Sequence, residues 1–227
     1  DQMSGGRVEL GLGAGWYAAE HTAYGFDFPP TAERFDSLHD QLAIITGLWA
    51  TPLGQRFHYN GSTHSVVDSP ALPKPVQSPP PIIIGGGGKV KTPRLAARFA
   101  AEFNMPFTPL DVYQKQCARV REACDRLGRT RPMIFSAALV VCAGADEDEV
   151  TRRAAAIGRE PAELRENGAA GTPAEVAETL RRWRDAGAER IYLQVLDLSD
   201  LDRALRVCDR IETGMATGLG RSAGLSG

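Results

Sequence analysis

Apolar and polar residues alternate along the chain in a way that predicts short strands, each followed by an amphipathic helix. The clearest helix is predicted over residues 31–49, whose apolar residues recur at helical spacing: Phe35, Leu38, Leu42, Ile45 and Leu48. Apolar runs predict strands over residues 7–12, 82–84, 102–107, 133–142 and 190–196. This βα succession indicates an α/β fold, either an open parallel sheet or a (β/α) barrel. Five such units are too few to close an eight-unit barrel, which needs about 250 residues.

Capping signals mark several helix boundaries. Thr92, Thr108 and Thr172 each precede a proline, and threonine caps a helix while proline fits its first turn. Thr172 and Glu175 have the spacing of a capping box. Together with the apolar periodicity, these signals predict helices over residues 93–101, 108–127, 146–158, 160–167, 172–186 and 199–211. Residues 20–30 are expected to be irregular.

Residues 53–80 depart from the βα pattern. Two short strands are predicted around Asn60 and Gly61, a pair that favours two-residue hairpin turns. A proline-rich, extended run follows over residues 69–81. We therefore expect residues 53–80 to form a hairpin-bearing excursion outside the main sheet, with His58 and His64 facing each other across the hairpin.

The predicted strand over residues 82–84 runs into four consecutive glycines, and two lysines follow at positions 89 and 91. Glycines permit a sharp turn and close approach to a ligand. Free N–H groups at the start of the next helix would face a space that an anion can fill. We therefore assign phosphate or cofactor binding to the following residues: Gly85, Gly86, Gly87, Gly88 and Lys89. The alternative is a tight turn that packs helix on strand without a ligand.

A second glycine-rich segment follows the predicted strand over residues 7–12. It does not fit the dinucleotide-binding pattern, because Trp16 stands where the third glycine is required and no helix is expected to follow directly. Glycine lets a strand end lie flat beneath a ring system. Residues Gly13, Ala14 and Gly15 are therefore candidates for cofactor contact.

Three side chains near this segment have alternative interpretations. Trp16 either contacts the cofactor or fills the core, as an aromatic residue after a glycine turn commonly does. Glu20 and His21 either form an acid/base pair or lie in a solvated loop.

Composition limits the classes of function. The 227-residue chain is 43% hydrophobic, enough for a core, and its net charge of -2 does not favour binding to nucleic acid or anionic membranes. No apolar run approaches the roughly 20 residues of a membrane span, and no secretory signal is recognised, so a cytoplasmic location is expected. The histidines and cysteines lack metal-ligand spacing, so no metal is predicted and Cys117 and Cys124 are expected to be free thiols on one helix face.

Three strings, taken in order, resemble the bacterial luciferase-like oxidoreductase family, and within it the branch that uses the deazaflavin coenzyme F420. They are RVELGLGAGW at residues 7–16, LPKPVQ at 72–77 and PIIIGGGG at 81–88, and segments 14–26 and 94–104 strengthen the match. The resemblance covers about residues 1–212. It implies a TIM (β/α)8 barrel with a hairpin insertion, of which this chain would contain strands four to eight. Residues 213–227 are expected to be a flexible tail.

The resemblance also implies an activity, namely hydride transfer between F420 and a small organic substrate. A monooxygenase dependent on flavin mononucleotide (FMN) is the close alternative. The cofactor would lie along residues 13–16 and place its phosphate at residues 85–89, and Asn104 and Gln194 are candidates for substrate contact. Each residue also has a purely structural interpretation: Asn104 would cap a turn, and Gln194 would belong to a layer of side chains inside the barrel.

No catalytic residue is assigned, because the resemblance places these on strands one to three. A homodimer is expected. The chain opens without methionine, so we expect residues before Asp1. A different class of function therefore stays open: a fragment, or a non-catalytic subunit whose open sheet edges are completed by a partner.

Overall fold

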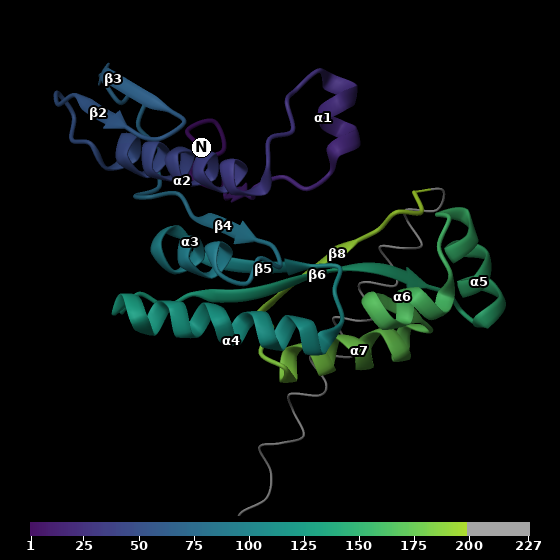
Figure 1. Ribbon diagram of the computed structural model, residues 1–227. Helices are drawn as coiled ribbons and strands as arrows, with labels where there is room; N and C mark the ends of the chain where they lie inside the picture. The colour runs from purple at the N-terminus through teal and green to yellow at the C-terminus, as the bar shows by residue number, and fades with distance from the viewer. Residues whose placement is uncertain (199–227) are drawn as a thin grey trace, which may run out of the picture. The chain divides into compact units, whose positions relative to one another are not determined.

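The computed structural model describes residues 1–198, which divide into two compact units. The first comprises Asp1–Phe103 and Arg119–Met133, and the second comprises Asn104–Ala118 and the chain from Ile134 onward. Strand β5 (Glu102–Pro106) and helix α4 (Leu110–Leu127) are each divided between the units (Figure 1). The helix predicted over 199–211 and the tail predicted over 213–227 lie outside the described residues.

The first unit is built on a parallel strand pair. Its elements are β1 (Leu10–Leu12), α1 (Ala18–Tyr24), α2 (Thr31–Ala50), β2 (Phe57–Asn60), β3 (Ser65–Ser69), β4 (Ile82–Gly85) and α3 (Lys91–Phe99). Strand β1 pairs with β4 in register, with Leu12 opposite Ile84. Ile82 and Ile84 are buried in the core, as expected for a strand covered by helices.

Two local predictions in this unit are wrong. Residues 20–30 are not irregular throughout, because α1 forms and ends at Gly25, whose φ of 71° is the left-handed conformation that glycine adopts readily. Thr92 does not cap α3, since the helix begins at Lys91, two residues before the predicted start, and Val90 occupies the N-cap position. The Thr92 side chain is buried against the glycine loop instead, and a Cβ on Gly88 would lie 2.5 Å from Thr92 Oγ1.

Helix α2 confirms the helix predicted over residues 31–49, and the β2–β3 hairpin packs against it. Leu38 and Leu42 are buried on its core side. Gly47 faces Phe57 of β2 so closely that an added Cβ would lie 2.2 Å from the ring. A glycine inside a helix weakens it, so we infer that this position serves the packing of the hairpin on α2 (Figure 1).

The hairpin itself confirms the predicted excursion, because β2 and β3 form a separate two-stranded antiparallel sheet. Its turn is longer than predicted: Asn60 pairs with Ser65, and residues 61–64 form the loop. The longer loop changes which residues face each other. His58 therefore does not face His64; its Nδ1 accepts a hydrogen bond of 3.1 Å from the Asp68 N–H.

The second unit is organised around a long central strand. Its further elements are β6 (Ile134–Ala143), α5 (Glu147–Ala156), α6 (Pro161–Asn167), β7 (Ala169–Gly171), α7 (Pro173–Asp185) and β8 (Arg190–Gln194). Strand β6 pairs in parallel with β8 along Ser136–Val140 and with β7 along Val141–Ala143. The sequence did not predict β7, because its residues, Ala169, Ala170 and Gly171, have low strand propensity.

Capping interactions define the helices of this unit. Asp146 caps α5, and its Oδ1 accepts from the Glu149 N–H at 2.9 Å. The predicted capping box is confirmed, since Thr172 and Glu175 exchange side-chain and backbone hydrogen bonds at the start of α7. Across residues 1–198, no helix is both long and apolar enough to cross a membrane.

Candidate functional site

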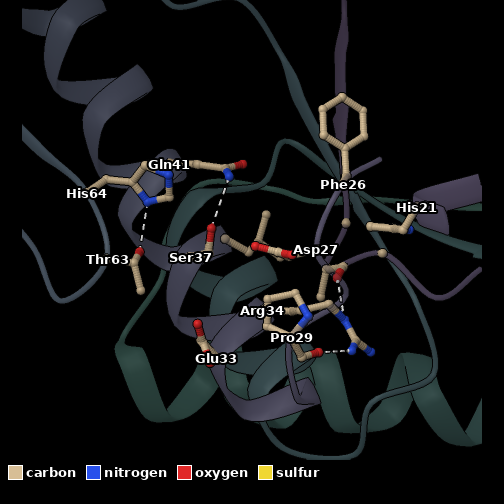
Figure 2. A pocket seen from close by; sticks show the side chains of 14 residues that line it. His21, Phe26, Asp27, Pro29, Glu33, Arg34, Ser37, Gln41, Thr63 and His64 are labelled. Atoms are coloured by element: carbon tan, nitrogen blue, oxygen red, sulfur yellow. Dashed lines mark hydrogen bonds between the residues drawn. The ribbon is translucent and has the colours of Figure 1, made fainter. Parts of the chain in front are cut away.

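A cavity of about 600 Å³ lies within the first unit, beside the end of β1 (Figure 2). Three parts of the unit form its walls: the segment between β1 and α2, which includes α1, the first half of α2, and the tip of the β2–β3 hairpin. Cavities of this size are typical of sites for small molecules and cofactors. All of the lining residues belong to the first unit.

The glycine segment after β1 forms the wall nearest the sheet. Gly13, Ala14 and Gly15 all line the cavity. A Cβ added to Gly13 would meet no atom within 4 Å, so the space beside it is open to a ligand. Gly15 has a φ of 73°, which favours glycine for conformational reasons. Trp16 does not line the cavity; it is 84% exposed and packs on Tyr17, so it does not fill the core.

The glycine run that begins at Gly85, the last residue of β4, leaves the sheet at the same end. Because Leu12 is opposite Ile84 in a parallel pair, residues 13 and 85 follow at the same level of neighbouring strands. Gly85, Gly86, Gly87 and Gly88 are nevertheless absent from the cavity lining, as is Lys89, which is exposed. The structure therefore brings the two predicted cofactor segments to the carboxyl ends of neighbouring strands. Only the segment of Gly13, Ala14 and Gly15 borders the cavity.

Lys91 does not contribute free positive charge to the glycine loop. Its Nζ donates to Asp36 Oδ1 at 2.7 Å and to the Ala32 carbonyl at 3.0 Å, both on α2. The charge of Lys91 is therefore paired with an acidic residue on the neighbouring helix rather than left for a phosphate at the glycine loop.

Arg34 of α2 holds the loop that follows β1. Its Nε donates to the Ala14 carbonyl at 3.1 Å, and its Nη1 donates to the Pro29 carbonyl (Figure 2). The guanidinium also lies 3.9 Å from the centroid of the Phe28 ring, a cation–π contact. These contacts fix the glycine segment relative to the helix.

His21 lines the cavity, but no acid/base pair with Glu20 is formed. The His21 Nδ1 lies 3.1 Å from the Tyr17 carbonyl, one helical turn earlier. Its ring packs edge-on against Phe28, with centroids 4.7 Å apart. The backbone and an aromatic ring, rather than the neighbouring carboxylate, therefore orient this imidazole.

The hairpin tip is held by a buried carboxylate, Asp40 of α2, which is 2% exposed. Its Oδ1 accepts from the Tyr59 hydroxyl at 2.7 Å. Its Oδ2 accepts from the Thr63 N–H at 2.7 Å, the Thr63 hydroxyl at 2.9 Å and the His64 N–H at 3.2 Å. Burial alone would raise the pKa of Asp40, but these hydrogen bonds outweigh it and hold the pKa well below its ordinary value.

The remaining wall presents neutral polar groups and carboxylates. Gln41 donates to Ser37 Oγ at 3.1 Å along α2, and His64 faces the same space from the hairpin tip (Figure 2). Asp27 and Glu33 also line the cavity. The Thr63 hydroxyl lies 2.7 Å from His64 Nδ1, but it donates its single proton to Asp40 Oδ2 at 2.9 Å. The imidazole is therefore not placed to activate this hydroxyl, and the arrangement suits the binding of a ligand rather than covalent catalysis.

The two predicted substrate contacts lie in the second unit and are separated along the strands. Asn104 Nδ2 donates to Ser136 Oγ at 2.8 Å. Ser136 is level with Arg190, whereas Gln194 is four residues further along β8, or about 13 Å at ~3.3 Å per residue. Gln194 is exposed, and neither residue lines the cavity.

Several cavity residues were not identified from the sequence. Glu33, Arg34, Ser37 and Gln41 recur at three- and four-residue spacing and so form a polar stripe on α2. This spacing could have indicated from the sequence that one face of α2 borders a polar site, because residues three and four apart share one helix face. Nothing in the sequence pattern indicated that Asp40 would be buried.

Comparisons with known proteins fit this architecture. Residues 1–169 match the model of the luciferase-like monooxygenase family. An F420-dependent glucose-6-phosphate dehydrogenase of Microbacterium testaceum is 35% identical over 131 residues, which are 57% of this chain and 37% of that protein. An FMNH2-dependent dimethylsulfone monooxygenase of Pseudomonas putida is 29% identical over 98 residues, which are 43% of this chain and 26% of that protein. The matched regions thus span well under half of these relatives.

Solved structures share the fold. An F420-dependent secondary alcohol dehydrogenase superposes with a TM-score of 0.75 at 17% identity, covering 88% of this chain and 68% of that chain. The coenzyme F420-dependent tetrahydromethanopterin reductase of Methanopyrus kandleri gives a TM-score of 0.67 at 15% identity. The superposition covers 86% of this chain and 70% of that chain. These neighbours are luciferase-like TIM barrels, of which this chain matches about two thirds. The predicted fold class is confirmed.

Proposed function

Because the chain belongs to the luciferase-like monooxygenase family, we propose that it is an oxidoreductase that binds coenzyme F420 and acts on a small organic substrate. The observation that carries this proposal is the open space beside Gly13. No atom lies within 4 Å of the place where a Cβ would stand, and the residue borders a cavity of about 600 Å³ at the end of a parallel strand. Ligands of α/β folds bind at this end of the strands.

The residues present fit a flat ring system at this position. Gly13 and Gly15 expose backbone without side chains, and Arg34 fixes the intervening Ala14 carbonyl. The glycines at 85–88 leave the adjacent strand at the same level and would hold the phosphate. When bound, the deazaflavin would supply hydride transfer, while this chain would supply orientation and exclusion of water.

Two F420-dependent relatives, from Microbacterium testaceum and Kineococcus radiotolerans, support F420 as the cofactor, at 35% and 29% identity. FMN is the second candidate, supported by the Pseudomonas putida relative at 29% identity. Both cofactors carry a phosphate, so the glycine segments suit either one. The proposal also includes a homodimer, which sedimentation velocity would test.

A side-by-side fluorescence titration of the 227-residue chain with F420 and FMN tests the proposal. Saturable binding of F420 with weak or undetectable binding of FMN is the expected result. Preference for FMN would assign the chain to the flavin-dependent monooxygenases. If neither cofactor binds, this chain is not a competent cofactor-binding protein by itself, and the fragment or partner-completed alternative takes its place.

A further inference from the structure

The tip of the β2–β3 hairpin is held in place more firmly than an exposed loop requires. One carboxylate oxygen, Asp40 Oδ2, accepts three hydrogen bonds within 3.2 Å from Thr63 and His64. Gly61 closes the turn behind them, and its N–H donates to the His64 carbonyl at 2.9 Å. Buried, charge-assisted hydrogen bonds of this kind are the strong ones. The position of these two residues is therefore set by α2 rather than by the hairpin alone.

Of the hairpin residues that donate hydrogen bonds to Asp40, Thr63 and His64 are the two that line the cavity. The His64 Nδ1 lies 2.7 Å from Thr63 Oγ1, so the imidazole is oriented by its neighbour. Within residues 1–198, no hydrogen bond that we observe engages His64 Nε2. The hairpin tip thus presents an oriented ring nitrogen at a cavity wall.

The groups around this nitrogen identify the chemistry of a suitable ligand. Gln41 and Ser37 face the same space with both donors and acceptors, and Asp27 and Glu33 add carboxylates. Arg34 is bound to the Ala14 and Pro29 carbonyls, so it does not balance these carboxylates for a bare anion. A wall of mixed donors, acceptors and carboxylates suits hydroxyl groups, which both donate and accept.

We propose that the hairpin insertion is part of the ligand site, where Thr63 and His64 contact a polyhydroxylated portion of the bound ligand and Asp40 is their positioning residue. This inference rests on the proposed function and extends it to a part of the chain not assigned there. The hydroxyl groups could come from two sources, the ribityl chain of the cofactor or a sugar-like substrate.

Fluorescence titration of the 227-residue chain with F420 and with FMN tests the first source. We expect His64→Ala to weaken cofactor binding by about five- to tenfold, the effect of one lost hydrogen bond. His64→Asn should recover most of this loss, because its amide keeps both a donor and an acceptor. The matched control is His58→Ala, on β2 of the same hairpin but outside the cavity, which should leave the affinity unchanged.

Asp40→Asn tests positioning. Its amide would direct two N–H groups toward a site lined by donors, so we expect weaker cofactor binding together with faster hydrogen exchange of the Thr63 and His64 amides. His64→Ala should weaken binding without accelerating the exchange of the Thr63 amide. A folded Asp40→Asn protein with normal affinity and normal exchange would contradict the positioning role.

Calorimetry with glucose, in the presence of the cofactor that binds, tests the second source. Weaker glucose binding by His64→Ala with unchanged cofactor affinity would assign the wall to a sugar-like substrate. If His64→Ala changes neither affinity while the parent chain binds F420 or FMN, the inference is wrong and the proposed function stands. If the parent chain binds neither cofactor, both fail together.

Discussion

Gly61 at the hairpin tip packs directly on the carboxylate of Asp40, since a Cβ at residue 61 would lie 2.4 Å from Asp40 Cγ. Real Cβ atoms do not approach other atoms so closely, so a larger residue would have to displace the carboxylate or the turn. The same carboxylate accepts hydrogen bonds from Thr63 and His64. The glycine and the aspartate therefore form one contact that sets where the hairpin meets α2.

The first prediction concerns this contact. Gly61→Ala should lower the free energy of unfolding by about 1–3 kcal/mol, the usual cost of overpacking a tight site. Urea unfolding measures the effect. Gly11→Ala is the matched control, because a Cβ there would meet no atom within 4 Å, and its free energy of unfolding should be unchanged or slightly higher. Equal stability of the two variants would show that the tip can move away from Asp40 without cost.

The second prediction concerns the other contact between hairpin and helix. Gly47→Ala alone should be destabilising by about 1–3 kcal/mol, because its Cβ would lie 2.2 Å from the Phe57 ring. In a Phe57→Ala background the same change should be stabilising by up to about 1 kcal/mol, because alanine is the better helix former. A double-mutant cycle measured by thermal unfolding tests this reversal of sign. Additive effects would contradict the direct contact.

The third prediction separates ligand approach from folding. Gly13→Ala should leave the unfolding transition close to that of the parent chain, because the space beside residue 13 is open. It should nevertheless weaken cofactor binding by about tenfold or more, since the methyl group would occupy the space of the ring. Gly11→Ala, two residues earlier, on β1 and outside the cavity, should bind normally. Unchanged affinity of Gly13→Ala would remove residues 13–15 from the cofactor site.

The sequence predicted those parts of the fold that depend on local periodicity. Helix α2, the buried isoleucine strand β4 and the capping box at Thr172 follow from residue spacing alone. The short strand β7 has no such signal, because Ala169 and Ala170 belong to a strand only through pairing with β6. Tertiary pairing, rather than local preference, decides such segments.

The candidate site was predictable only in part, for a similar reason. Glycines at 13 and 15 are visible as a pattern, and the structure places them at the cavity. The hairpin register was not visible, because Asn60 and Gly61 favour a two-residue turn while contacts with Asp40 stabilise a loop of four residues. A contact between residues more than 20 positions apart leaves no trace in local periodicity, so the place of His64 at the cavity wall could not be anticipated.

The fourth prediction concerns pH. Burial disfavours the charged form of Asp40, but hydrogen bonds from Thr63, Tyr59 and His64 outweigh it and hold its pKa well below the ordinary value. The unfolded chain therefore binds a proton at higher pH than the folded chain does. The stability that this carboxylate contributes is fully present above the ordinary aspartate pKa of ~3.9, and it is lost as the pH falls from there toward the folded-state pKa.

The test compares urea unfolding of the parent chain and Asp40→Asn between about pH 7 and about pH 2.5, a range that spans the ordinary aspartate pKa. The parent should be more stable at neutral pH, and its advantage should shrink steadily below about pH 4, because the unfolded chain then binds a proton at Asp40 that the folded chain does not yet bind. Asp68→Asn serves as the control, since this carboxylate is exposed on β3 and lies outside the tip cluster. Equal stability of the parent chain and Asp40→Asn at every pH would mean that Asp40 acts through shape rather than charge. In that case the hairpin tip would be held by packing on Gly61, and the amide of Asp40→Asn would serve as well as the carboxylate.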